Sequence, residues 1–204
     1  YVDRTCYVGL DRAMVGDITS LVALFPDPDG GCTIFPFNIQ SSGAISEAND
    51  YLRSIYAKAE DEEDLNVYNS ATIRDEHVKE NIRWLWQELP NCQGFYYDPW
   101  HMKEIALDLE EEGIPMIAVS QGTGNMSEPA KKLESLIKEG IFRYNGSVLF
   151  TYAASCALTG VTKQGNMTVF RDNGNYKTDK IDPLIATIIA LSGATLQKQE
   201  SFIY

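Results

Sequence analysis

The chain has 204 residues, a length typical of a single domain. Hydrophobic residues make up 44% of it, which excludes a wholly disordered chain, and no apolar run approaches the roughly 18 residues of a membrane-spanning helix, so we expect no membrane partner. Lys and Arg number 17 against 29 Asp and Glu, a net charge of −12. This charge excludes a basic surface that binds nucleic-acid phosphates passively, but it does not exclude an acidic metal site.

The first forty residues predict three consecutive strands. Residues 6–10, 19–25 and 32–38 are apolar runs, and the last two are separated by the dense turn signal P-D-P-D-G-G at 26–31. Strands joined by short turns pair with their neighbours, so we expect a β-meander over residues 5–38.

The rest of the chain alternates helices and strands. Apolar residues at helical spacing, with start and stop signals such as Ser127 before and Gly140 after one segment, predict the helices. The predicted helices cover 47–58, 75–89, 101–112, 128–139, 148–158 and 184–191; the predicted strands cover 94–97 and 115–119, and a hairpin-like turn is expected at 172–175. This order indicates an α/β fold with a mixed central sheet and not a doubly wound Rossmann sheet.

The four cysteines, Cys6, Cys32, Cys92 and Cys156, do not form a zinc site. None belongs to a C-x-x-C pair, and the chain has only two histidines. We expect four free thiols in a reducing cytoplasm, with two disulfides as the alternative.

Three aspartates stand at predicted element boundaries. Asp11 and Asp98 follow the apolar runs Y-V-G-L and G-F-Y-Y, and Asp182 precedes P-L-I-A-T-I-I-A-L. Strands of an open α/β sheet gather such residues at one edge, where three carboxylates bind hard divalent cations through oxygen. Two such cations activate a water and stabilise the leaving oxygen of a phosphodiester.

Other interpretations of these residues remain open at this point. Asp98-Pro99 and Asp182-Pro183 also have the pattern of a helix N-cap followed by proline. Asp17, six residues after Asp11, is equally well a turn residue before the second strand. Spacing alone does not separate caps from metal ligands.

Five segments, in this order, resemble the nuclease domain of phage terminase large subunits. Together they span roughly residues 6–192. They are G-L-D-R-A-M-V-G-D-I-T-S-L-V-A-L-F-P-D, L-N-V-Y-N-S-A-T-I-R-D-E-H-V, F-Y-Y-D-P-W-H-M-K-E-I-A-L-D-L-E-E-E-G-I-P-M-I-A-V-S-Q-G, N-M-S-E-P-A-K-K-L-E-S-L-I-K-E-G-I-F and K-I-D-P-L-I-A-T-I-I-A-L.

The resemblance implies an RNase H-like fold and a metal-dependent DNA endonuclease that cuts concatemeric viral DNA during genome packaging. It matches the family's catalytic acids to Asp11, Asp98 and Asp182, with Asp11 bridging two Mg²⁺ or Mn²⁺ ions and the other two each holding one. Asp17 matches an auxiliary acid of some members. The chain departs from the family where Pro183 replaces a frequent glycine, which would shift Asp182, and where Ser155-Cys156 replace a frequent asparagine.

Several further residues are weaker candidates for contacts with DNA. Lys177 and Lys180 precede Asp182, and Gln121 opens the loop Q-G-T-G-N, which lacks the pattern of a P-loop. His101, three residues after Asp98, is another candidate and is equally well an exposed residue of the first helical turn.

Since a P-loop is absent, we expect residues 1–204 to form one nuclease domain, the C-terminal part of a larger terminase whose ATPase domain lies elsewhere. The expected partners are double-stranded DNA, that ATPase domain, the portal and the small terminase subunit, in the bacterial host cytoplasm and transiently at the procapsid. The alternatives are an actin-like ATPase domain and a non-catalytic docking module of the packaging motor.

Tryptophan placement gives two further expectations. Trp84 and Trp86 lie two apart on one predicted helix, so one should face the core and the other solvent or a partner. Trp100 should pack at the start of the next helix.

Overall fold

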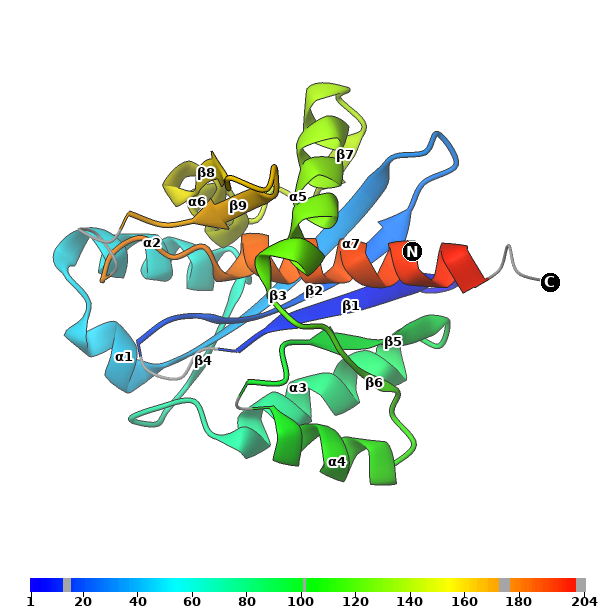
Figure 1. The fold of residues 1–204 in the computed structure, drawn as a ribbon. Helices are drawn as coiled ribbons and strands as arrows, with labels where there is room; N and C mark the ends of the chain where they lie inside the picture. Colours follow the sequence, from blue (N-terminus) through cyan, green and yellow to red (C-terminus); the bar gives the residue numbers. More distant parts are fainter. Residues whose placement is uncertain (13–15, 101, 173–176, 201–204) are drawn as a thin grey trace.

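A computed structural model describes residues 1–12, 16–100, 102–172 and 177–200, except the side chains of 196–200. Its centre is a seven-stranded mixed sheet with the order β4-β3-β2-β1-β5-β6, in which β7 also pairs with β3 (Figure 1). The strands are β1 (Cys6–Asp11), β2 (Thr19–Pro26), β3 (Cys32–Ser41), β4 (Leu65–Tyr68), β5 (Cys92–Tyr97), β6 (Met116–Ala118), β7 (Phe142–Tyr144), and the separate hairpin β8 (Leu158–Val161) and β9 (Met167–Phe170). The helices are α1 (Ser42–Glu47), α2 (Asp50–Asp61), α3 (Asp75–Glu88), α4 (Lys103–Glu111), α5 (Thr123–Lys138), α6 (Val148–Cys156) and α7 (Asp182–Glu200).

The predicted β-meander is confirmed. β1 pairs antiparallel with β2, and β2 pairs antiparallel with β3. Along β2, Leu21 and Ala23 belong to one apolar cluster, whereas Val22 and Leu24 belong to the other. The meander is therefore buried on both faces, which explains why its strands are continuous apolar runs and do not alternate with polar residues.

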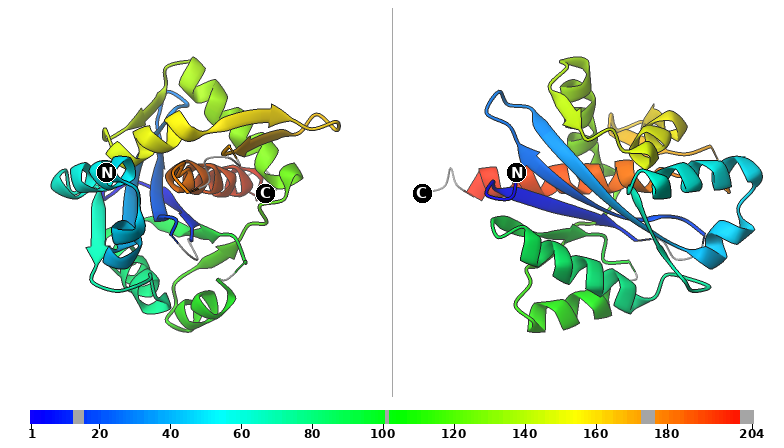
Figure 2. Two further views of the ribbon diagram at one scale, coloured as in Figure 1. Left: turned by 90° about the vertical axis from the view of Figure 1, so that its left-hand side faces the viewer. Right: turned by 180° about the vertical axis from the view of Figure 1, so that it is seen from behind.

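Helices cover the two faces of the sheet as separate layers. α3 and α4 pack on one face through one apolar cluster, whereas α5 and α7 pack on the other. α7 runs across β1 and β2, and Figure 2 shows it end-on beside the sheet. Gly9 of β1 permits this approach, because a Cβ there would lie 2.0 Å from the carbonyl oxygen of Ala186 in α7. The expected α/β architecture, a mixed central sheet that opens with a β-meander and is flanked by helices, is confirmed.

Several element boundaries differ from the expectations. The helix expected over 47–58 is α2, which begins three residues later because Asn49 caps it by accepting a hydrogen bond from the Leu52 amide. The short helix α1 before it was not expected. The short strands β4 and β7 were not expected, since four-residue and three-residue segments carry too little periodicity to be recognised.

The boundaries of α5 and of the hairpin also need correction. α5 begins at Thr123, so Ser127 lies within it and is not its N-cap; its buried hydroxyl accepts from the Met167 amide. Gly140, with φ +70°, ends this helix as expected. The hairpin turn lies at 162–166 between β8 and β9, whereas residues 173–175 of the turn predicted at 172–175 lie outside the described residues.

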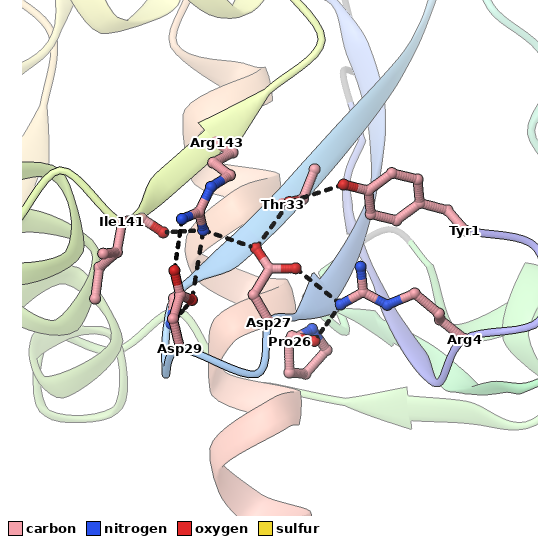
Figure 3. Close-up of polar contacts among 9 residues, drawn as sticks. Tyr1, Arg4, Pro26, Asp27, Asp29, Thr33, Ile141 and Arg143 are labelled. Carbon is pink, nitrogen blue, oxygen red and sulfur yellow. Dashed lines mark hydrogen bonds and ion pairs between the residues drawn. The ribbon is translucent and has the colours of Figure 1, made fainter.

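A polar cluster joins the β2–β3 turn to the N-terminal segment and to β7 (Figure 3). Asp27 accepts from Arg4 at 2.8 Å, from the Thr33 hydroxyl at 2.8 Å and from Arg143 at 3.1 Å. Arg143 also pairs with Asp29 at 2.5 Å. This cluster ties three segments that are far apart in the sequence.

The four cysteines are free thiols, as expected, so the disulfide alternative is wrong. Trp86 packs against the core and Trp84 is 45% exposed, which confirms the expected division between them. Trp100 is 76% exposed, so the expectation that it packs at a helix start is wrong. Within the described residues we find no helix with the length and apolarity that crossing a bilayer requires.

Candidate active site

The register of the central strands brings Asp11 and Asp98 to the same edge of the sheet. β1 and β5 are parallel, and Leu10 lies opposite Tyr97. Asp11 and Asp98 are each the next residue along the chain, so they occupy neighbouring positions where the two strands end. Carboxyl ends of adjacent parallel strands are where sites form in open α/β sheets.

Asp182 lies near this edge on the face of the sheet that α7 covers. It is the first residue of α7, one helical turn before Ala186, which contacts Gly9 of β1. Asp182 is only 8% exposed, and its Oδ2 atom is buried without a hydrogen-bond partner. A buried carboxylate oxygen without a partner is costly, which makes Asp182 a candidate ligand for a cation.

The aspartates interact electrostatically. The pKa of Asp11 is raised to about 7, mainly by burial; the carboxylates of Asp98 and Asp17 contribute to the increase, while Gln121 and Arg171 oppose it. Burial also raises the pKa of Asp182, with further contributions from Asp11 and Asp17. Like charges this close disfavour ionisation, so a cation at this site would stabilise the ionised carboxylates.

Asp17 differs from the other acids because it is already paired with cations. Its carboxylate accepts from Arg171 at 2.9 and 3.0 Å and from Lys180 at 2.6 Å. Burial alone would raise the pKa of Asp17, but these two partners lower it below its usual value. Asp17 therefore joins the segment that follows β9 to the loop before β2.

The two Asp-Pro pairs have different roles from the caps that their sequence pattern suggests. Asp98 accepts from the Trp100 amide at 2.8 Å and closes a turn, whereas α4 begins only at Lys103. In α7, the Ile181 carbonyl accepts the amides of Leu184 and Ile185, so Asp182 is already inside the helix. Neither aspartate is the N-cap residue of the following helix.

The remaining candidates lie around this cluster at different degrees of exposure. Gln121, just after β6, donates through Nε2 to Asp11 Oδ1 at 3.4 Å. Lys180 is buried, and Lys177 is exposed on the rim of a 300 Å³ pocket that Lys180 also lines. His101 lies outside the described residues. Sequence reasoning missed Arg171, because a lone arginine before a turn carries no recognisable signal.

The residues present fit a divalent cation in donor type, although not as a closed ligand shell. Carboxylate oxygens are the ligands that Mg²⁺ and Mn²⁺ prefer, and Asp182 offers an oxygen without a partner. In the part of the chain that the structure describes, no group of three His, Cys, Asp or Glu side chains is close enough together to hold a metal ion. Asp11 and Asp182 thus lie close enough for their charges to interact, but the described side chains do not form a complete coordination shell.

The chain that carries these aspartates matches one known protein family over most of its length. The profile of the terminase large subunit, endonuclease domain, matches residues 2–198, nearly the whole chain. The chain belongs to this family. The resemblance found in the sequence is therefore confirmed, and the aspartate cluster lies in a terminase nuclease domain.

Individual relatives agree with this assignment. The chain is 24% identical over 193 residues to the terminase large subunit of Enterobacteria phage HK97, covering 94% of this chain and 38% of that protein. It is 31% identical over 103 residues to protein YmfN of Escherichia coli K12, covering 50% of this chain and 22% of that protein. The chain thus spans well under half the length of both curated relatives.

Solved structures show the same fold. The large terminase of bacteriophage HK97 superposes with a TM-score of 0.82 at 23% identity, covering 93% of this chain and 39% of that chain. The large terminase nuclease of thermophilic phage G20c with bound magnesium gives a TM-score of 0.63 at 12% identity, covering 94% and 82% of the two chains. The same G20c nuclease has also been solved with bound cobalt.

Proposed function

We propose that this terminase nuclease domain is a metal-dependent DNA endonuclease that cuts concatemeric viral DNA during genome packaging. The observation that carries the proposal is the buried Asp182 carboxylate, whose pKa is raised by burial and by the charge of Asp11 at the same edge of the sheet. Family membership favours this activity over an actin-like ATPase domain.

In this proposal Asp11, Asp98 and Asp182 would hold two Mg²⁺ or Mn²⁺ ions. The ions would supply an activated water and stabilise the leaving oxygen of the phosphodiester. Their binding requires Asp11 and Asp182 to be deprotonated, which their raised pKa values oppose without metal. We keep Asp17 as an auxiliary acid whose charge Arg171 and Lys180 balance.

The neighbouring polar groups position the acids and contact the substrate. Gln121 donates to Asp11 and fixes the orientation of its carboxylate. Of the two lysines, the exposed Lys177 would offer a cation to the phosphates of double-stranded DNA, whereas the buried Lys180 is held by Asp17. The neutral amide of Gln121 would offer a hydrogen bond to the same phosphates. The net charge of −12 makes binding by this domain alone weak, so the rest of the packaging machinery would hold the DNA.

The wider setting of the domain is also part of the proposal. The chain corresponds to 38% of the length of the HK97 large subunit. We infer that residues 1–204 are the C-terminal nuclease domain of a larger terminase. An ATPase domain would be elsewhere in that chain, and the portal and small subunit would be its partners at the procapsid in the bacterial cytoplasm.

Plasmid digestion tests this function. The wild-type chain should nick and linearise supercoiled plasmid with Mn²⁺ or Mg²⁺ and be inactive with chelator. Asp11→Asn, Asp98→Asn and Asp182→Asn should each lose at least about 100-fold in rate, since each removes a charged ligand. Asp3→Asn, an exposed position away from the site, is the matched control. A folded wild-type chain that never cleaves with metal would instead indicate a docking module.

A further inference from the structure

A recess of about 400 Å³ lies beside the edge strand β4, between β3, β4 and α3. Ligand sites in proteins commonly measure roughly 300–1,000 Å³, so the recess is large enough for a bound group. Its lining contains three carboxylates and no lysine, arginine or histidine. None of the three catalytic candidates lines it, so this inference does not depend on the nuclease proposal.

One wall of the recess is aromatic. Trp84 of α3 is 45% exposed, and its ring meets Phe37 of β3 edge to face, with centroids 5.4 Å apart and an interplanar angle of 74°. Trp86 on the same helix faces the core, so Trp84 is held with part of its indole open to solvent. An exposed indole face attracts cations through its quadrupole, and arginine more often than lysine.

The carboxylates at the recess lack cationic partners within the described part of the chain. Glu63 and Glu80 form no ion pair with any described residue, and the Glu80 carboxylate accepts a long hydrogen bond of 3.4 Å from the Tyr68 hydroxyl. Elsewhere on α3, Glu76 pairs with Arg83 at 2.7 Å. Glu63 and Glu80 therefore place two carboxylates without ion-pair partners in the same recess as the ring of Trp84.

The third carboxylate, Asp64, has a structural role. It accepts from the Ser147 hydroxyl at 2.9 Å and from the Leu149 amide at 2.8 Å, at the start of α6. Its charge contributes to the negative potential of the recess, but its oxygens are engaged. Glu63 and Glu80 are thus the groups that a ligand would contact.

We propose that this recess binds an arginine side chain carried by a basic segment of a partner protein. A guanidinium stacks on the face of Trp84 and donates in its plane to carboxylates, which an ammonium does not do in the same way. Nucleic acid is disfavoured by the negative charge of the lining. The chain's net charge of −12 would speed association with a basic partner.

The test uses the peptide acetyl-Gly-Arg-Gly-Arg-Gly-amide and the indole N–H signals of the ¹⁵N-labelled chain. Trp84→Phe identifies the Trp84 signal, and Trp86 and Trp100 serve as internal references. We expect saturable movement of the Trp84 signal alone, with a dissociation constant on the order of 1 mM or below. The same peptide with lysine should bind about threefold more weakly, and with glutamine it should not bind.

Charge variants separate a specific site from general attraction. Glu63→Gln/Glu80→Gln should weaken peptide binding about tenfold, as expected for the loss of two charge-assisted contacts. Glu104→Gln/Glu111→Gln on α4 removes the same charge from exposed positions elsewhere and should leave binding unchanged.

Three results would overturn the proposal. The first is no movement of the Trp84 signal at about 10 mM arginine peptide, ten times the expected upper dissociation constant. The second is equal weakening by both double variants, which would indicate unspecific attraction. The third is movement of the Trp84 signal with protein concentration alone, together with self-association in sedimentation, which would assign the recess to a second copy of the chain.

Discussion

In the metal-free protein, the carboxyl group of Asp11 lowers the free energy of unfolding at neutral pH. Its pKa rises from 3.8 to about 7 on folding, so the folded state binds more protons than the unfolded state between these values. Stability from this group is complete below pH 4 and is lost as pH rises through 7. Asp11→Asn should therefore raise the free energy of unfolding at pH 8 with chelator by about 1–2 kcal/mol. This is less than the whole pKa shift corresponds to, because solvent screens part of the interaction.

Urea unfolding at pH 8 and pH 4 measures this gain. The gain should shrink toward pH 4, where wild-type Asp11 is protonated in the folded state and about half protonated in the unfolded state. Asp3→Asn should show no comparable effect, because Asp3 lies on the exposed surface. A destabilised Asp11→Asn at pH 8 would mean that Asp11 forms favourable contacts that outweigh its crowding.

At the scale of secondary-structure elements, the β2–β3 turn depends on Asp27 (Figure 3). Burial would raise the pKa of Asp27, but Arg4, Thr33 and Arg143 lower it below the usual value. Its stabilisation is thus present above pH 4 and disappears as pH falls through the lowered pKa. Asp27→Asn should cost about 1–2 kcal/mol at pH 7 and progressively less below pH 4.

Thermal melts across this pH range check the role of the turn. Asp29→Asn is the matched control, because Asp29 pairs with Arg143 in the same turn but is largely exposed. If Asp27→Asn and Asp29→Asn lowered the melting temperature equally, the turn would not depend on Asp27 more than on Asp29.

The contact between β1 and α7 controls where Asp182 sits. A Cβ on Gly9 would lie 2.0 Å from the Ala186 carbonyl oxygen and 2.5 Å from the Ala190 amide nitrogen, so α7 would have to move. Gly9→Ala should destabilise the chain by about 2–4 kcal/mol and reduce cleavage, because overpacking displaces backbone. Gly124→Ala in α5 meets no atom within 4 Å and should be tolerated.

Unfolding and plasmid cleavage of both glycine variants should be measured together. A Gly9→Ala chain that is as stable and active as wild type would show that α7 approaches β1 less closely than we describe.

At the scale of the whole molecule, metal binding, the protonation of the aspartates and the free energy of unfolding are linked. Mn²⁺ or Mg²⁺ at 100 times its dissociation constant should stabilise the chain by about 2.7 kcal/mol near neutral pH. The gain should shrink as pH falls, because binding competes with protonation of Asp11 and Asp182. Mn²⁺ should do at least as well as Mg²⁺, since it tolerates looser geometry.

Melting temperatures with and without Mn²⁺ test this linkage. Asp11→Asn and Asp182→Asn should lose the Mn²⁺-dependent shift, whereas Asp3→Asn should keep it. Absence of any shift in the wild-type chain would contradict the proposed metal site.

The sequence by itself determined the β-meander, most of the helices and the family. The continuous apolar run of β2 and the helical spacing of apolar residues in α3 are local signals that tertiary packing does not reverse. The three candidate aspartates were also found this way, because strand ends and family segments are local features. The short strands β4 and β7 were missed because their partner β3 decides them, not their own residues.

Only the tertiary structure decided which groups face one another. Parallel pairing of β1 with β5 sets Asp11 beside Asp98, and the passage of α7 over Gly9 adds Asp182 to the same edge. Arg171 and Lys180 reach Asp17 across more than 150 residues of chain, and the recess beside Trp84 forms from three separate segments. Such contacts depend on packing between distant segments, and a local sequence pattern holds no information about which distant charge will meet it.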